Sequence, residues 1–354
     1  MNILDDLNRI QSLDKDDMYK AISGFPEEIK DALSICEKFE FDAEAYRNVN
    51  HIILCGMGGS AIGGDLARAL LINELDITFD TCRDYNLPRY ADKTTLVIGS
   101  SYSGNTEETL SAFQQAIDRN CKLFAITTGG SLSKLAEEHN VPTIKPRPGF
   151  QPRAALSYSF TLLMHFLFET GYSTYDNSSI MQMAKFLKKR LMNFTIDNKV
   201  VDNLTKQLAE RLLGRLPIIY SGPSLTAPAA LRFKGQICEN AKCLAFTNQF
   251  PEFNHNELVG WELVDEFHDK LFVVVLRDSD DGERVSLRMD IVESLIAQKE
   301  VDIVEIESVG DNKLERLFSL IQVADFTSFY LAILNNVDPT PVKPIEALKR
   351  ELRT

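Results

Sequence analysis

Short apolar runs alternate with amphipathic stretches along most of the chain. In the first half, the runs 51–57, 94–101 and 122–128 are each followed by a segment whose apolar residues recur at helical spacing. Runs that are apolar throughout are typical of strands buried on both faces, so the alternation predicts a parallel sheet covered by helices on each side. The pattern returns in the second half, with strand candidates at 217–221, 243–247, 270–276 and 301–306.

The segment 146–152 (PRPGFQP) interrupts this alternation, and a helical region follows it before the second series of strands. The pattern therefore predicts an α/β protein with two doubly wound, flavodoxin-like parallel sheets. We place the first domain at 1–160 with N-terminal helices, a helical connection at 161–195, and the second domain at 196–354 with a C-terminal helix. The 354 residues suffice for two such domains, and a crevice between them is the expected place for a ligand.

The chain is acidic, with 51 Asp and Glu residues against 38 Lys and Arg residues and a formal net charge of −13. This balance argues against nucleic-acid partners and anionic membranes, although a local site can still bind a small anion. The N-terminus lacks the apolar core of a signal peptide, and the longest apolar run, 160–168, is too short to span a bilayer. We expect a cytoplasmic protein in which that run is a buried helix.

The cysteines and histidines show no metal-binding spacing. The six cysteines include no CxxC, and the five histidines include no HxH or HxxxH. We therefore expect free thiols in a reducing compartment and no metal ion. His165 lies in an apolar stretch and is expected to be a core histidine, whereas His255 lies among polar residues, in NHNE, which favours a functional role.

Two turns in the first half combine a strand end with a helix start. The first, 56–65, reads GMGGSAIGGD, and its glycines allow backbone N–H groups at a helix N-terminus to approach an anion. The alternatives are a plain tight turn or a dinucleotide-binding loop. The register from Gly56 to Ala61 with Asp80 further along fits the latter only loosely, because the last glycine is replaced by Ala.

The second turn, 100–109, reads SSYSGNTEET and lacks the Lys of a nucleotide-binding P-loop. Ser101, Ser103 and Thr106 supply three hydroxyls beside free helix N–H groups, which suits a phosphate monoester. The alternative is that Asn105 caps the helix with Glu108 as its capping-box partner. Capping does not need the further hydroxyls, so we favour phosphate binding.

Six segments in register carry a resemblance to a known family. SSYSGNTEET resembles the phosphate loop of sugar-isomerase (SIS) domains, and GMGGSAIGGD, QPRAAL, ENAK, FNHNE and VKPIEALK complete a set similar to the bifunctional phosphoglucose/phosphomannose isomerases. The resemblance implies two SIS domains in a homodimer that acts on small-molecule sugar phosphates. It also implies interconversion of fructose 6-phosphate with glucose 6-phosphate and mannose 6-phosphate through a cis-enediolate, without a cofactor.

The resemblance also implies roles for individual residues. Glu239 in CENAK matches the general base, His255 the ring-opening group, and Arg153 in QPRAAL an arginine suited to the enediolate charge. Lys349 fits the lysine of the last helix, with Lys343 as a poorer match and Thr340 as a candidate helper. Whether His255 acts in its own subunit or the partner's is left open. The phosphate ligands implied are Gly59, Ser60, Ser101, Ser103 and Thr106.

Plainer interpretations and other functions compete with this one. Without the resemblance, Glu239 is one of many helix carboxylates, Arg153 a possible bridge at the domain junction, and the C-terminal lysines a solvated helix end. A sugar-phosphate sensor built on the SIS fold would need an effector such as a basic helix-turn-helix domain, and no segment fits one. An NAD-dependent oxidoreductase would rest on the first glycine turn alone.

Overall fold

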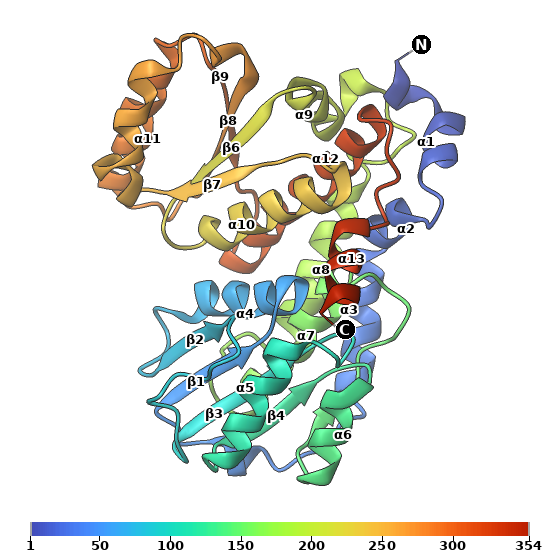
Figure 1. Ribbon diagram of the computed structural model, residues 1–354, viewed down its shortest axis with the longest axis vertical. Helices are drawn as coiled ribbons and strands as arrows, with labels where there is room; N and C mark the ends of the chain where they lie inside the picture. The colour runs from blue at the N-terminus through green and yellow to red at the C-terminus, as the bar shows by residue number, and fades with distance from the viewer. Residues whose placement is uncertain (1, 353–354) are drawn as a thin grey trace. The chain divides into compact units, whose positions relative to one another are not determined.

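The computed structural model describes residues 2–352, which form two compact units. One unit comprises residues 24–188, and the other combines the residues up to 23 with those from 189 onward. Each unit contains one parallel sheet flanked by helices (Figure 1). The predicted α/β class, with two doubly wound sheets, is therefore confirmed.

The sheet of the 24–188 unit has the order β2-β1-β3-β4-β5, and all its strands are parallel. The chain steps from β1 to β2 on one side and returns to β3 on the other, so the topological switch point lies between β1 and β3. The strands are β1 (His51–Cys55), β2 (Thr78–Cys82), β3 (Thr95–Ser100), β4 (Lys122–Ile126) and β5 (Thr143–Ile144).

Helices cover both faces of this sheet, as expected for strands without a polar side. α5 and α6 cover one face (Figure 1), where their Phe113 and Leu132 pack with Val97 of the sheet. On the other face Phe124 stacks on Phe166 of α7, with ring centroids 3.8 Å apart. The helices are α3 (Phe25–Cys36), α4 (Gly58–Leu71), α5 (Glu107–Asp118), α6 (Gly130–Glu138), α7 (Leu156–Glu169) and α8 (Asn177–Leu191), with the 3₁₀ turn η2 (Ala43–Tyr46).

The second sheet has the parallel order β7-β6-β8-β9, with a switch point between β6 and β8. Its strands are β6 (Leu216–Ser221), β7 (Phe246–Gln249), β8 (Leu271–Arg277) and β9 (Asp302–Glu307). Its helices are α1 (Leu7–Leu13), α2 (Met18–Ser23), α9 (Leu204–Leu212), α10 (Thr226–Gln236), α11 (Glu283–Ala297), α12 (Lys313–Leu334) and α13 (Lys343–Glu351). The short helical segments are the π-helical η4 (Ile237–Ala241) and the 3₁₀ turns η1 (Ile3–Asp5), η3 (Val200–Asp202), η5 (Glu252–His255), η6 (Glu257–Leu263) and η7 (His268–Lys270).

The compact units differ from the predicted domain boundaries at two places. The N-terminal helices, expected in the first domain, pack with the second half of the chain. The fully buried ammonium of Lys206 donates to the carbonyl of Leu4 over 2.5 Å and pairs with Asp5 at 3.3 Å, which ties the N-terminus to α9. The expected connection 161–195 instead belongs largely to the first unit, because α7 is buried against its sheet.

Two expectations about apolar segments and thiols are confirmed. The run 160–168 lies in α7, whose side chains from Leu156 to Leu167 are all buried. All six cysteines are free. Within the described chain, α12 is long and apolar enough to cross a bilayer by composition, but 94% of its apolar window is buried inside the protein, as in a core helix.

A buried carboxyl on α3 makes the stability of the protein depend on pH. Glu28 is 8% exposed, and its Oε2 accepts a hydrogen bond from Ser157 Oγ over 2.5 Å. Burial, with a smaller contribution from the nearby charge of Asp31, raises the pKa of Glu28 to about 7, although the hydrogen bond from Ser157 acts in the opposite direction. Because the folded state holds this proton more tightly than the unfolded state, its contribution to stability declines as pH rises from about 4.5 to 7.

Glu28→Gln is therefore expected to stabilise the protein at pH 8 by up to about 3 kcal/mol and to have little effect at pH 4.5. Urea denaturation of variant and wild type at both pH values measures the difference. Glu27→Gln is the matched control: Lys188 and Lys30 hold the pKa of Glu27 below its ordinary value, so this variant gains nothing at high pH. An effect of Glu28→Gln that does not change with pH would contradict the prediction.

Candidate functional site

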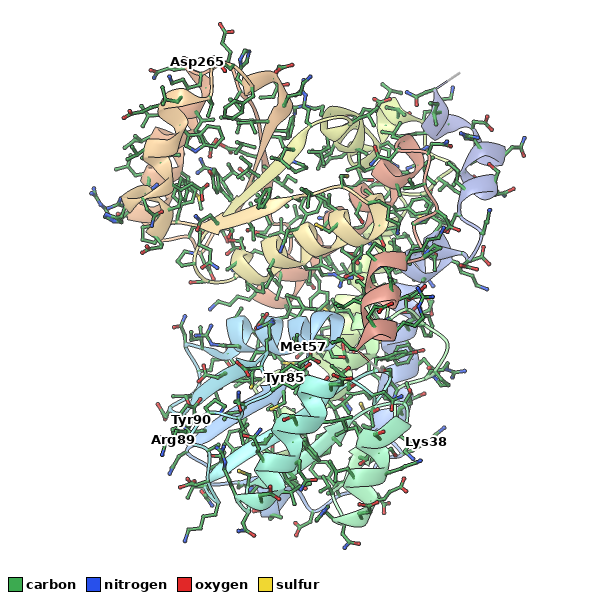
Figure 2. All side chains as sticks on the ribbon, in the orientation of Figure 1. Lys38, Met57, Tyr85, Arg89, Tyr90 and Asp265 are labelled. Carbon is green, nitrogen blue, oxygen red and sulfur yellow. The ribbon has the colours of Figure 1, made fainter. Side chains whose placement is uncertain are left out.

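Two loops meet at the switch point of the first sheet, at the carboxyl ends of β1 and β3. The β1–α4 loop holds Met57, which lies at the N-terminal end of α4 (Figure 2). The backbone N–H of Tyr102 donates to Ser60 Oγ over 3.2 Å, so the two loops are hydrogen-bonded to each other. Gly56 allows this approach, since a Cβ there would lie 2.9 Å from the carbonyl oxygen of Ser100. Ligands of open α/β sheets bind at this position.

Within the β3–α5 loop, the three predicted hydroxyls differ in their surroundings. Ser101 is 1% exposed; its Oγ accepts from the N–H of Gly104 over 3.1 Å and lies 2.9 Å from Thr106 Oγ1. Ser103 is exposed, and Thr106 is half-buried at the start of α5. The hydroxyl of Ser101 therefore shapes the turn, and that of Ser103 faces outward.

The capping interpretation of Asn105 is wrong. The N-cap of α5 is Thr106 and not Asn105, and no side chain forms a cap hydrogen bond there. Glu108 is therefore not part of a capping box with Asn105. Asn105 Oδ1 instead accepts from the N–H and the hydroxyl of Ser131, both over 3.1 Å, which links the loop to the start of α6. The first-turn N–H groups of α5 therefore lack a side-chain cap, which leaves this helix start suited to an anion.

Gly104 is required by the close packing of this loop on the β4–α6 turn. Its φ is +68°, and a Cβ at this position would lie 1.8 Å from the carbonyl oxygen of Gly129. Any side chain would push the loop away from its neighbour, and L-residues rarely adopt this φ. The GNTEE turn is therefore packed directly against the β4–α6 turn.

Arg153 lies on a third loop that packs against the first. A Cβ on Gly59 would lie 2.4 Å from the carbonyl oxygen of Pro152 and 3.1 Å from the Cα of Arg153, so only glycine admits this contact. Tyr102 also holds the loop, because its hydroxyl donates to the carbonyl of Arg147 over 2.7 Å and accepts from the N–H of Phe150 over 3.0 Å. The structure thus brings buried Arg153 together with the predicted phosphate-binding residues.

In the second unit, Glu239 lies on a single turn of π-helix at the end of α10. It is half-buried, and Lys242 ends the turn with a left-handed φ of +58°. Lys242 Nζ donates to the carbonyl of Glu239 and, over 2.9 Å, to that of Pro339. This second bond places the segment of buried Thr340 beside the turn. Such π-turns are frequent at functional sites.

His255 is exposed at the end of η5, just after β7. Phe253 anchors the segment by stacking on Tyr220 with centroids 4.2 Å apart. Glu257, the last residue of the NHNE motif, is a second anchor, since its carboxylate accepts from Tyr220 over 2.5 Å and from Asn248 over 2.6 Å. The segment is therefore held firmly while its histidine faces outward.

Glu239 and His255 lie on either side of β7 in the second unit. In a parallel sheet, α10 must run from the carboxyl end of β6 back to the amino end of β7, and it lies along β7 in Figure 1. Glu239 precedes β7 and His255 follows it. The two residues therefore flank the strand at its opposite ends, and the strand has four residues at about 3.3 Å each.

The predicted lysines both lie on α13. Lys349 is exposed in its last turn, where a cation also suits the helix dipole, and Lys343 is the first helical residue. Buried His165 has the hydrogen-bonded setting of a core histidine, with its Nδ1 3.2 Å from Asn177 Oδ1. Within residues 2–352, no cluster of three His, Cys, Asp or Glu side chains is arranged to hold a metal ion.

Comparison with known proteins places the chain among sugar-phosphate enzymes. The family model of the bacterial phospho-glucose isomerase C-terminal SIS domain matches residues 201–352. The chain is 41% identical over 335 residues to a bifunctional phosphoglucose/phosphomannose isomerase of Caldicellulosiruptor bescii, covering 95% of this chain and 98% of the relative. A protein of the same name from Aquifex aeolicus is 35% identical, with coverages of 96% and 99%. The crystal structure of tagatose-6-phosphate ketose/aldose isomerase from Escherichia coli has a TM-score of 0.69 at 18% identity, covering 92% of this chain and 96% of that one.

Proposed function

The chain belongs to the bifunctional phosphoglucose/phosphomannose isomerase family, and on this premise we propose how it interconverts fructose 6-phosphate with glucose 6-phosphate and mannose 6-phosphate. The observation that carries the proposal is that three loops contact one another at the switch point. The β1–α4 loop is hydrogen-bonded to the β3–α5 loop and also packs against the loop that carries Arg153. An anion-binding cradle beside a buried guanidinium suits a phosphorylated sugar whose reaction develops negative charge.

In this proposal the phosphate binds at the starts of α4 and α5. Ser103, Thr106 and Ser60 donate hydroxyl hydrogen bonds, Gly59 supplies a backbone N–H, and Ser101 keeps the turn in shape. Ser60 suits this role because its oxygen already accepts from Tyr102, which leaves its hydrogen for the ligand. Binding energy at the phosphate then orients C1 and C2, which lie far from it.

The proton transfer is assigned to Glu239. Its carboxylate takes a proton from C1 or C2 and returns it to the other carbon through a cis-enediolate, with no metal or other cofactor. Arg153 stabilises the negative charge on the enediolate oxygens, and His255 moves protons in ring opening, a step that suits imidazole near neutral pH. Lys349 is the candidate lysine of the site, with Lys343 as the alternative, and Thr340 lies next to the Glu239 turn as a candidate helper.

We further propose that the enzyme is a cytoplasmic homodimer in which the partner's His255 completes each site. The separation of Glu239 from His255 by the length of β7 supports a second chain as the source of the histidine. Beside the His255 segment, α11 exposes an apolar row of Leu287, Ile291 and Leu295 at helical spacing, and Arg288 of the same helix donates to Asn254 over 3.4 Å. A second copy covering this row would remove apolar surface from water.

The competing functions are less well supported. A dinucleotide-binding loop would need an acidic residue at the end of the second strand, whereas Asp80 lies in the middle of β2 and accepts a hydrogen bond from the Tyr90 hydroxyl over 2.8 Å. A sugar-phosphate sensor would bind fructose 6-phosphate without converting it.

One experiment separates these cases. The purified chain is incubated with fructose 6-phosphate and a chelator, with no nicotinamide, and the formation of glucose 6-phosphate and mannose 6-phosphate is followed by NMR. Formation of neither product would overturn the proposal.

Ser103→Ala is expected to lower kcat/KM roughly 10- to 150-fold, because a hydrogen bond to a charged group contributes about 1.5–3 kcal/mol. Steady-state kinetics measure the loss, and crystals grown with sulfate should show the anion at the start of α5. Ser111→Ala is the matched control, since its hydroxyl lies further along the same helix and donates to the carbonyl of Tyr85 over 2.8 Å. Wild-type kinetics for Ser103→Ala would remove Ser103 from the site.

A further inference from the structure

A row of buried polar side chains joins α10 to α12 and has no role in the reaction as proposed above. Asp325 of α12 accepts from Arg232 Nε over 3.1 Å and from Nη2 over 2.7 Å, which is the bidentate geometry of a strong ion pair. Gln236, one turn further along α10, donates to the same carboxylate over 2.9 Å. All three residues are at most 5% exposed.

The row continues into the π-helical turn that carries Glu239. Asn240 is fully buried, and its Nδ2 donates to Ser328 Oγ over 2.9 Å. Ser328 in turn donates to the backbone carbonyl of Asp325 over 2.8 Å, so the ion pair and the π-turn share one chain of hydrogen bonds. Arg232, Gln236 and Asn240 follow each other at intervals of four, which places them on one side of the helix.

This arrangement restricts how α10 can lie on α12. Buried polar groups cost free energy unless they are hydrogen-bonded, so sliding or rotating α10 would leave a buried charge and amides without partners. No regular helix follows the π-turn to fix its direction. Its last carbonyl, that of Ala241, accepts a hydrogen bond over 2.8 Å from the side-chain amide of Asn335, the residue that caps the C-terminus of α12. The row therefore sets the position of the turn on which the carboxylate stands.

We propose that Ser328 and Asp325 are positioning residues for Glu239. Ser328 holds Asn240, the residue next to Glu239, and thereby sets the direction in which the carboxylate leaves the backbone; Asp325 fixes the register of the helix before it. The inference rests on the proposed role of Glu239 as the base. A catalytic group misplaced by about 1 Å can cost about 100-fold in rate, so a support of this kind is consequential.

The test compares Ser328→Ala with its neighbour Thr327→Val. Both side chains are fully buried on α12, but Thr327 Oγ1 has no hydrogen-bond partner among the described residues. Ser328→Ala is expected to lower kcat for both products roughly 10- to 100-fold with KM for fructose 6-phosphate unchanged, and Thr327→Val to leave both constants near wild type. Amide hydrogen exchange of residues 237–241 should rise in Ser328→Ala alone.

The exchange measurement separates this inference from the proposed function, because it does not require isomerase activity. Faster exchange at the turn in Ser328→Ala with a lower kcat supports the positioning role, while unchanged exchange and kcat would overturn it even in an active isomerase. An equal loss of kcat in Thr327→Val would also overturn it, since the effect would then be general packing. If Ser328→Ala does not fold, Ser328→Cys replaces the hydroxyl with a somewhat larger group that is a weaker hydrogen-bond acceptor and donor, and it is measured in the same way.

Discussion

Replacing Glu239 with Gln is expected to lower the rates of formation of glucose 6-phosphate and of mannose 6-phosphate together, by about 10²- to 10⁴-fold or more. Gln keeps the shape of the side chain but cannot take a proton, and general acid–base catalysis typically contributes this much. Both activities should fall because one carboxylate serves both faces of the enediolate, with rotation about C2–C3 presenting either face. Steady-state rates for each product, measured separately from fructose 6-phosphate, give the two ratios.

Binding of a sugar phosphate that cannot isomerise, such as glucitol 6-phosphate, should survive in Glu239→Gln. The proposed phosphate contacts lie on other loops, so a calorimetric dissociation constant near wild type is expected. Glu262→Gln is the control, since this carboxylate is exposed on η6 of the same unit. If Glu239→Gln kept either activity near wild type, the two reactions would not share this base.

Mixing two inactive variants, Glu239→Gln and His255→Ala, is expected to restore activity. If the partner's His255 completes each site, a mixed dimer contains one site with both wild-type groups and one with neither. Random pairing makes half of the dimers mixed, so recovery of about one quarter of wild-type activity is the upper limit for a two-fold dimer. Unfolding and refolding the subunits together, followed by kinetic assay, measures the recovery.

Each variant refolded alone provides the baseline, and native mass spectrometry of a mass-labelled variant confirms that subunits have exchanged. A mixture of Glu239→Gln with Arg153→Ala gives a second comparison that tests the source of the arginine in the same way. Confirmed mixed dimers without activity would show that each chain builds its site from its own Glu239 and His255. That result would leave the assignment of the base untouched.

The sequence by itself determined the local elements and the chemistry of the loops. The run 94–101, with its apolar centre LVIG, predicted a strand buried on both faces, and β3 is buried at every residue from Thr95 to Ser100. The turns 56–65 and 100–109 predicted the positions at which strands end and helices begin, because the conformation of a turn depends on residues within a few positions of it. The expectation for 243–247 was displaced, since Lys242 ends the π-turn and β7 begins only at Phe246.

Only the tertiary structure decided how these parts combine. Buried Lys206 bonds the N-terminal segment to the second half of the chain. Tyr102 bonds the β3–α5 loop to the β1–α4 loop. Asp325 lies at the centre of a mostly apolar helix, and its partner Arg232 lies 93 positions away in the sequence. Hydrophobic period and turn chemistry are read from neighbours along the chain, whereas a buried charge finds its partner through packing, which brings together residues that no local pattern connects.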